Sequence, residues 1–469
     1  MEENRTLEMQ LGSEETEFKR EIGLFGGVSI LGGIMIGGGI FYLGSYVLMR
    51  VGYSLGWALA AWVIGGLICL LGGLCFAELG AEMPVQGGMT TYLSRAYHPC
   101  VGFVNGFSGF LLTASGSIAS LAMASVIPFQ EEFQLTELQT KIIAIAIIVF
   151  FTWFNLRGVK SASRFQDFTM VVRVIPLILV IVLGVFAGKE HVDLSVAGAF
   201  QGNVSIGNCI KVIGYATFAS LWAYEGWTNL NTVAGEMKRP KRDLPLAIIL
   251  SMGFITLVYT LFNFAIYRVI PSAEVNSMIQ SGSIYLGKET AYRVMGHFGK
   301  WIVMIGMCVG IIGTVNGDCL VFPRTYYAMA KGGYFWKSFG TLNKNGVPQV
   351  SMLWSSGIAI VLVIFNSLQS LTDLLVTTSA LLNMMAVIAV LIFRKKYPDM
   401  ERPYKVWGGV PVICLTIVFF AVLLINNLVS DIKGSLLGFL IPVLCVPFYF
   451  YFRKKNGGVD YSGDDSELE

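Results

Sequence analysis

The feature that most constrains this chain is a series of apolar runs, each long enough to cross a membrane as a helix. Crossing about 30 Å of hydrocarbon takes about 20 mostly apolar residues in helical form. Twelve runs meet this length, at residues 22–49, 55–78, 99–128, 138–157, 167–187, 209–235, 244–269, 299–330, 350–367, 370–393, 410–429 and 435–452. The runs are continuous and lack the alternation of barrel strands of about 10 residues. They therefore predict an all-α polytopic membrane protein with 12 transmembrane helices.

Composition supports this fold class and excludes others. Only 13% of the 469 residues are charged and 55% are hydrophobic, whereas soluble domains are about a quarter charged. A soluble enzyme, a disordered protein and a nucleic-acid binder are therefore excluded. The eight cysteines lie within apolar runs or at their ends, which indicates buried thiols rather than a disulfide scaffold. The three histidines are far apart in the sequence, so we expect neither a metal site nor a cofactor.

The distribution of Lys and Arg predicts the orientation in the membrane. With twelve spans both termini lie on one side, and 23 of the 33 basic residues fall on that side, against nine on the other. Because positive charge is enriched in cytoplasmic loops, we expect a multi-pass protein of the cell (plasma) membrane with both termini in the cytoplasm. Residues 1–21 are then a polar cytoplasmic segment, and residues 453–469 a disordered, acidic cytoplasmic tail.

The first span contains an unusual glycine cluster. Gly37, Gly38 and Gly39 are consecutive, and each costs about 1 kcal/mol relative to Ala inside a helix. Close helix packing is an alternative explanation, because Gly33 and Gly37 form a small-xxx-small pair. Packing, however, explains spaced glycines better than a contiguous triplet. The cluster therefore predicts an unwound segment whose backbone N–H and C=O groups face a cavity or other protein.

The sixth span has a second interruption, within residues 219–227. It combines Gly226 with the carboxylate of Glu225 and three aromatic side chains. A charge at the centre of a span costs about 2.5–3.5 kcal/mol on insertion scales and usually faces a cavity or a partner. The alternative explanation for Glu225 is a structural ion pair that faces the interior of the bundle.

The positions of the two interruptions predict an internal repeat. Spans 1–5 (residues 22–187) and spans 6–10 (residues 188–393) form two five-helix units, with helices 11 and 12 (residues 394–452) appended. An odd number of spans per unit inverts the second unit relative to the first. Secondary transporters use this plan and bind substrate at the midplane, between discontinuous helices. Half-helix N-termini attract an anion and C-termini a cation, which suits a zwitterionic amino acid.

Several motifs carry a resemblance to a known family. They are Gly32–Phe41; Gly73–Gly80 with Pro84, Gly87, Gly88, Tyr92 and Leu93; Trp222–Trp227 with Leu230, Asn231, Glu236, Pro240 and Asp243–Pro245; and Asn316, Gly317, Arg324, Asn383 and Arg402–Lys405. From about residue 20 to 410 the chain resembles the amino acid–polyamine–organocation (APC) superfamily, and within it a prokaryotic-type member of the L-amino acid transporter (LAT) family. The resemblance implies a LeuT-type 5+5 inverted repeat with helices 1 and 6 broken, and an amino acid transporter that works by alternating access.

The resemblance also implies a substrate site. Its residues are Met35, Gly37, Gly38, Gly39, Ile40, Trp222, Ala223, Glu225 and Asn383. Backbone N–H groups at residues 38–40 would hold the substrate carboxylate. Carbonyl groups of Met35, Trp222 and Glu225 would meet the α-ammonium group. Trp222 would be the gate over bound substrate, with a core or interfacial Trp as the alternative. Asn383 would line the side-chain pocket, or else form a helix–helix hydrogen bond.

Three residues depart from the family pattern. Arg173 stands where the family usually has a Lys that replaces a sodium site of other relatives, so sodium coupling is disfavoured. Because Arg keeps its proton, proton coupling at this position is disfavoured too, and exchange is favoured. Glu225 stands where relatives have a small residue or Asp, which favours cationic side chains or amines. Asp318 adds a carboxylate in span 8, and we hypothesise an Arg173–Asp318 ion pair.

These observations predict an exchanger of neutral or broad-range L-amino acids without sodium coupling. The alternative is a cationic amino acid or polyamine transporter that uses Glu225. A channel is less favoured because repeated filter segments are absent, and an enzyme because no nucleophile, base or metal set converges. No cysteine lies in the loop between spans 3 and 4, where animal members bind a heavy subunit through a disulfide. We therefore expect a monomer without a heavy-chain partner.

Overall fold

The computed structural model describes residues 22–83, 88–130, 132–195 and 205–456. Within these ranges the chain forms helices and turns, with one isolated β-bridge between Ile22 and Met237. The all-helical prediction is therefore confirmed for the described residues. The predicted N-terminal segment 1–21 and the motif residues Pro84 and Gly87 lie outside them. Of the predicted tail, residues 457–469 also lie outside, while residues 453–456 continue the last helix.

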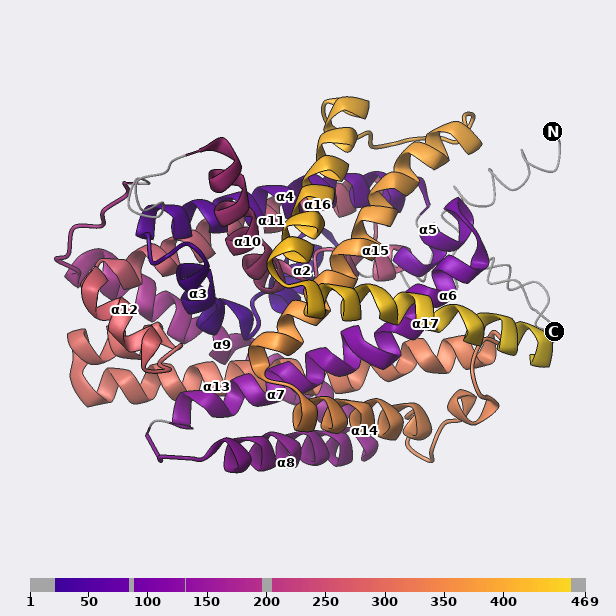
Figure 1. Ribbon diagram of the computed structural model, residues 1–469. Coiled ribbons are helices and arrows are strands. Elements are labelled where there is room, and N and C mark those ends of the chain that lie inside the picture. Colours follow the sequence, from indigo (N-terminus) through magenta and orange to yellow (C-terminus); the bar gives the residue numbers. More distant parts are fainter. Residues whose placement is uncertain (1–21, 84–87, 131, 196–204, 457–469) are drawn as a thin grey trace.

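Most of the helices are joined by short connections, and the longer ones are residues 188–205 and 397–408 (Figure 1). In chain order they are α2 (Leu24–Met35), α3 (Gly39–Arg50), α4 (Leu55–Glu82), α5 (Met89–Ala96), α6 (Pro99–Ser108), the π-helix η1 (Gly109–Thr113), α7 (Ala114–Gln130), α8 (Glu137–Leu156), α9 (Val159–Ala187), α10 (Ile206–Tyr224), the 3-10 helix η3 (Asn229–Glu236), α11 (Pro240–Tyr267), α12 (Ser272–Gln280), α13 (Leu286–Lys331), the 3-10 helix η4 (Lys337–Gly340), α14 (Gln349–Phe365), α15 (Leu368–Lys396), α16 (Gly409–Ser430) and α17 (Ile432–Asn456). Figure 1 shows α4 and α13 running lengthwise along opposite sides of the molecule.

The described helices include eight that are long and apolar enough to cross a membrane, and the bent pair of α2 and α3 makes a ninth candidate. The number of twelve spans therefore stays a prediction. Three predicted spans fall on shorter apolar stretches. Span 5 corresponds to the apolar part of α9 (Val172–Ala187), and span 9 to α14 (Gln349–Phe365). Span 6 is divided between α10 and η3, because the chain leaves the α-helix after Tyr224.

Glycines on α13 bring α9 into close contact with it. A Cβ atom placed on Gly310 would lie 2.6 Å from Cβ of Arg173, and one on Gly306 would lie 3.0 Å from Cδ of Pro176. Both distances leave no room for a larger side chain. Small residues at such interfaces let helix backbones approach each other inside a membrane. This packing fixes the position of Arg173, which reaches from α9 toward the end of α2.

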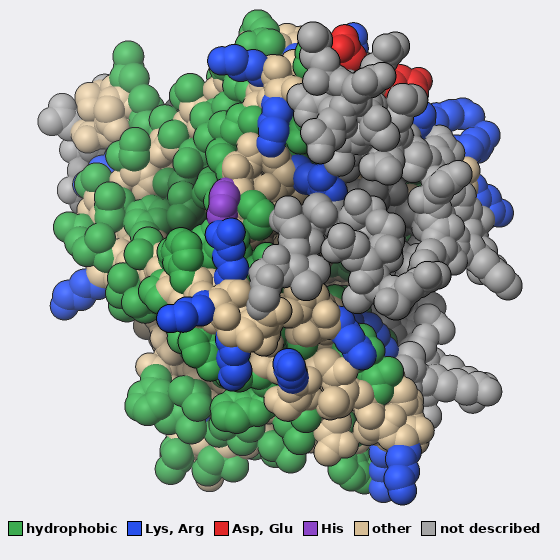
Figure 2. Space-filling model, turned by 90° about the vertical axis from the view of Figure 1, so that its right-hand side faces the viewer, with side chains coloured by type: hydrophobic (Ala, Val, Ile, Leu, Met, Phe, Trp, Pro, Cys, Tyr) green, Lys and Arg blue, Asp and Glu red, His purple; other side chains and the backbone are tan. Residues whose placement is uncertain are grey.

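One end of the molecule carries many basic side chains (Figure 2). Exposed Lys and Arg residues in the segments that the sequence assigns to the cytoplasmic side include Lys238, Arg239, Arg242, Lys331, Lys337, Lys344, Lys395, Lys396, Lys405, Arg453, Lys454 and Lys455. This is the end at which α17 finishes (Figure 1). Such clustering supports a cytoplasmic location for this end, and the orientation of the termini stays a prediction.

Candidate functional site

The first predicted interruption is present between α2 and α3. The helix stops at Met35 and restarts at Gly39, with a bend of 55° between the two parts. Gly38 is the N-cap of α3, and no described side chain caps it. The first N–H groups of a helix have no partner within the helix, and they carry its positive dipole end. The start of α3 is therefore suited to bind an anionic group such as a carboxylate.

The second predicted interruption follows α10. The helix ends at Tyr224, Glu225 is extended (φ −60°, ψ 144°), and Gly226 adopts φ +114° before the chain enters η3. A residue with a Cβ would be strained at that φ. It would also lack space, because a Cβ on Gly226 would lie 2.6 Å from Cγ2 of Ile34. Glycine at this position therefore allows both the turn and the close approach to α2.

The two interruptions are in direct contact. A Cβ on Gly39 would lie only 2.9 Å from Cα of Ala223. From α11, the hydroxyl of Tyr259 lies 2.6 Å from the carbonyl oxygen of Met35 and 3.1 Å from that of Ala223. The hydroxyl has one hydrogen to donate and lies within reach of both carbonyl oxygens, so it links the ends of the two broken helices. Peptide groups freed by both breaks are thus gathered in one place.

The site residues predicted from the sequence differ in their exposure. Met35, Gly38, Gly39, Ile40 and Ala223 are buried, whereas Gly37, Trp222 and Glu225 are partly exposed.

Glu225 and Asn383 are brought together from different parts of the chain. Both line a small cavity, together with side chains of α4 and α16. The Asn383 amide interacts with the Glu225 carboxylate. Both a pocket-lining role and a helix–helix hydrogen bond fit this contact, so the role of Asn383 stays a prediction. Among the described residues, no three His, Cys, Asp or Glu side chains lie close enough to hold a metal ion.

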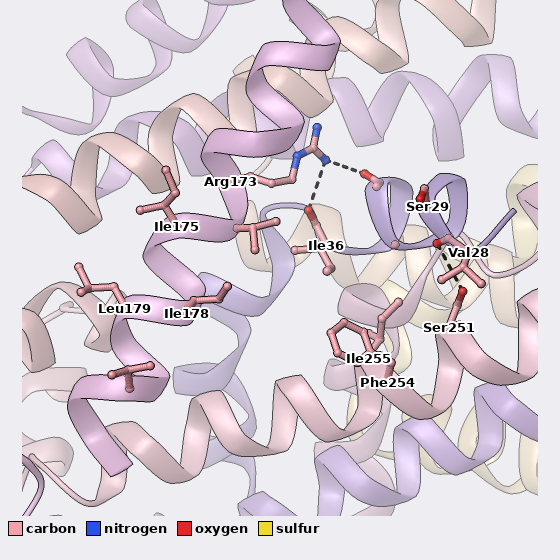
Figure 3. A pocket seen from close by; sticks show the side chains of 14 residues that line it. Val28, Ser29, Ile36, Arg173, Ile175, Ile178, Leu179, Ser251, Phe254 and Ile255 are labelled. Carbon is pink, nitrogen blue, oxygen red and sulfur yellow. Dashed lines mark hydrogen bonds between the residues drawn. The ribbon is translucent and has the colours of Figure 1, made fainter. Parts of the chain in front are cut away.

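Arg173 binds the end of α2 (Figure 3). Its Nη1 donates to the carbonyl oxygens of Gly33 at 2.6 Å and Ile36 at 3.3 Å, and lies 3.4 Å from Oγ1 of Thr314. The last carbonyl groups of a helix lack partners within the helix and form its negative dipole end. A permanent cation at this place therefore stabilises the interruption and compensates for the burial of Arg173, whose surface is only 1% exposed.

Asp318 has a different hydrogen-bond partner from the one predicted. Its Oδ2 accepts a hydrogen bond from Oγ of Ser117 on α7 at 2.6 Å. Arg173 and Asp318 interact electrostatically, but the hydrogen bonds of Arg173 go to the carbonyl groups at the end of α2. A direct hydrogen-bonded ion pair between the two therefore stays a prediction.

Figure 3 also shows a hollow between α2, α9 and α11. It has a volume of about 840 Å³ and is lined mainly by apolar side chains, with Arg173 among the few polar ones. Lining residues such as Ile175, Ile178 and Phe254 are at least half exposed. Exposed apolar side chains on helices of membrane-spanning length are expected to face lipid, so the substrate site stays predicted at the helix interruptions rather than in this hollow.

Comparison with known proteins identifies the family. Residues 22–450 match the amino acid permease family. The chain belongs to this family. It is 28% identical to the serine/threonine exchanger SteT of Bacillus subtilis over 461 residues, which cover 95% of this chain and 99% of the relative. It is 29% identical to the human cystine/glutamate transporter (94% and 87% covered) and to the human Asc-type amino acid transporter 1 (94% and 84% covered). The chain is thus an amino acid transporter of the APC superfamily and not an enzyme.

The sequence analysis of this permease missed an ion pair at the far end of α3. Arg50, the last residue of α3, donates two hydrogen bonds to Asp373 in the first turns of α15, at 2.7 and 2.6 Å. It also donates to the carbonyl oxygen of Tyr215 on α10, and its guanidinium lies 4.1 Å above that ring. The three helices are thereby joined at the end of α3 that is remote from the glycine cluster.

Tyr259, Ser117 and Asp373 were not identified as site residues from the sequence of the permease. Each forms the hydrogen bond described above with a residue at least 36 positions away in the sequence. A partial signal existed for Asp373, because a carboxylate near the start of an apolar run needs a partner. Tyr259 and Ser117 are common side chains inside membrane helices, and no motif marks them.

Proposed function

We propose that this permease is an exchanger of neutral or broad-range L-amino acids that works by alternating access. The observation that carries the proposal is the contact between the two interrupted helices. The N-terminus of α3 offers N–H groups for a carboxylate. At the end of α10, the carbonyl groups of Trp222 and Glu225 offer acceptors for an ammonium group, whereas those at the end of α2 already accept from Arg173 and Tyr259. These complementary groups match the part that all amino acids share.

We propose the LeuT-type fold as the architecture that supports alternating access. Residues 22–187 and 188–393 are the two inverted five-helix repeats, and residues 394–452 are the added helices. The breaks within the first and sixth predicted spans support this division, because inverted repeats place discontinuous helices at equivalent positions.

We also propose that transport does not need sodium. The guanidinium of Arg173 already binds the carbonyl groups at the end of α2, which a cation would otherwise coordinate. Arg stays protonated under all physiological conditions. A fixed charge at this position supports exchange of one amino acid for another, rather than coupling to a proton that Arg173 would have to release.

A second candidate substrate class is supported by Glu225. Its partner in the cavity is the neutral amide of Asn383, and a carboxylate at this depth is stabilised by a cation. Cationic amino acids or polyamines are therefore the alternative substrates.

We further propose that the chain works as a monomer without a heavy-chain subunit, in the plasma membrane, with both termini in the cytoplasm.

Counterflow in proteoliposomes tests the main proposal. Internal unlabelled amino acid should accelerate uptake of labelled amino acid, and replacing sodium with choline should leave the rate unchanged. Gly39→Ala should abolish counterflow, because its Cβ would meet Ala223, whereas Gly253→Ala on α11 has open space around its Cβ and should not. Equal activity of both variants, or uptake by the wild type that internal substrate does not accelerate, would contradict the proposal.

A further inference from the structure

We propose that Asp318, together with Ser117, binds the side-chain ammonium group of a basic L-amino acid while its α-amino acid part lies at the helix interruptions. The inference rests on the proposed transport function and specifies part of its substrate range. It assigns the recognition of cationic substrates to α7 and α13, in addition to the carboxylate of Glu225 that the sequence singled out.

The first observation is the state of the Asp318 carboxylate. Within the described part of the chain, Asp318 accepts a hydrogen bond from the hydroxyl of Ser117, and this bond uses the Oδ2 atom of the carboxylate. Both side chains are partly exposed although they face each other between two helices. A carboxylate at this depth does not face lipid, so its accessible surface is turned toward a space inside the protein. One carboxylate oxygen thus remains for a ligand.

The second observation is a stripe of accessible residues around this carboxylate, which we call the track. It consists of Gly109, Thr113 and Ser117 on the η1–α7 side, and Thr314 and Asp318 on α13. The members on each side are spaced four residues apart, which places them on one helix face. All five are partly exposed, whereas most of their neighbours on η1, α7 and this part of α13 are buried. The track is therefore a row of accessible positions on two facing helices.

A π-helical turn contributes to the track. The segment Gly109–Thr113 is π-helical, and such turns inside α-helices are frequent at functional sites because they change which side chains face a neighbour. A Cβ on Gly109 would lie 3.7 Å from Oγ1 of Thr113 and 3.9 Å from the hydroxyl of Tyr326 on α13. The turn therefore directs polar groups of this span toward α13.

The track begins at the first helix interruption. A Cβ on Gly37 would lie 3.7 Å from Oγ1 of Thr314. Asp318 is one helical turn further along α13, which is a rise of about 6 Å. A lysine side chain places its ammonium group about 6 Å from its Cα atom, since five single bonds of about 1.5 Å separate them. An amino acid held at Gly37–Gly39, beside Thr314, is therefore about one helical turn from Asp318, which is close to the length of a lysine side chain.

The charges around the site favour a cation as well. With the carboxylates ionised, Arg173 contributes one positive charge, and Asp318 and Glu225 contribute two negative charges. The guanidinium of Arg173 is directed toward Gly33 and Ile36, so it compensates for charge without occupying the free oxygen of Asp318. One negative charge remains, and a bound ammonium group would neutralise it inside a medium where unpaired charge is costly.

Lysine and norleucine provide a direct test, because norleucine has the same carbon chain without the ammonium group. We expect Asp318→Asn to weaken lysine binding to the purified, full-length protein about tenfold or more, since a charge-assisted hydrogen bond is lost. Norleucine binding should stay within about twofold. Ser117→Ala keeps the carboxylate and should produce a smaller loss that is again specific for lysine. Binding is measured by isothermal titration, with diaminopropionate, whose side chain is too short to reach Asp318, as a further probe.

Glu225→Gln and Val321→Ala are the comparison variants, and thermal unfolding checks that each protein is folded. Val321 lies on α13 and is exposed, so its variant should bind both ligands as the wild type does. The inference is wrong if Asp318→Asn weakens lysine and norleucine equally, if it weakens neither, or if Glu225→Gln alone removes the preference for lysine. If Asp318→Asn fails to fold, lysine and norleucine binding is measured for Asp318→Glu and Ser117→Ala instead. The inference is then wrong if these variants weaken both ligands equally or weaken neither. Wild-type protein without any amino acid counterflow would instead contradict the proposed function.

Discussion

Removing the hydroxyl of Tyr259 tests the link between the two interrupted helices. In Tyr259→Phe the ring keeps its packing, with centroids 5.8 Å from Trp62 and 5.2 Å from Tyr224. The carbonyl oxygen of Ala223 loses the donor that lies 3.1 Å away, and that of Met35 loses the donor at 2.6 Å but keeps the N–H of Gly37 at 2.7 Å. Leaving a buried polar group without its partner costs about 1–3 kcal/mol. We expect the free energy of unfolding to fall by this amount, and counterflow to fall more steeply than stability.

Tyr267→Phe is a matched control on the same helix. Tyr267 is also buried, but among the described residues its hydroxyl has no hydrogen-bond partner. Removing that hydroxyl should leave stability unchanged or raise it slightly, because a buried group without a partner is already unfavourable. Both variants are compared by denaturant unfolding in detergent and by counterflow in proteoliposomes. If Tyr259→Phe behaves like Tyr267→Phe in both assays, the hydroxyl does not connect the interrupted helices and the reasoning fails.

Three further predictions concern other parts of the molecule. Arg50→Ala leaves the carboxylate of Asp373 without its cation, and should lower the free energy of unfolding by roughly 3 kcal/mol; unfolding that matches the wild type would show that the pair contributes nothing. Gly226→Ala should abolish counterflow, because its φ of +114° strains any residue with a Cβ; normal counterflow would mean that this turn is not needed. The hydrogen bond and charge of Lys300 lower the pKa of Glu132, so Glu132 contributes stability above its unfolded pKa of about 4.3, and this contribution is lost as the pH falls. The melting temperature of Glu132→Gln should therefore depend less on pH between 7 and 4 than that of the wild type, and identical curves would refute this assignment.

The two helix interruptions were predictable from the sequence because their causes are local. Three adjacent glycines weaken any helix that contains them, and the structure stops α2 at Met35 and restarts at Gly39. A carboxylate followed by a glycine in the sixth apolar run predicted the second break, and α10 ends at Tyr224. Each prediction needed a window of about ten residues and the cost of non-helical backbone inside a membrane.

The partners of the charged residues in the spans were not predictable in the same way. The sequence indicated that Arg173 and Asp318 need partners, because a charge is costly in a span. It paired them with each other, and that ion pair stays a prediction. Their hydrogen bonds, which no short window contains, go to the carbonyl groups of Gly33 and Ile36, 140 and 137 positions from Arg173, and to the hydroxyl of Ser117, 201 positions from Asp318.

The sequence alone determined that this protein is a helical membrane protein with breaks in two of its helices, since hydrophobic length and backbone propensity are properties of short segments. Tertiary packing decided which groups the breaks expose to one another. The close contact of Gly39 with Ala223 and the link through Tyr259 exist only because α11 and α10 lie against the interrupted helix. Such contacts depend on the relative positions of distant helices, and a short window of sequence does not contain that information.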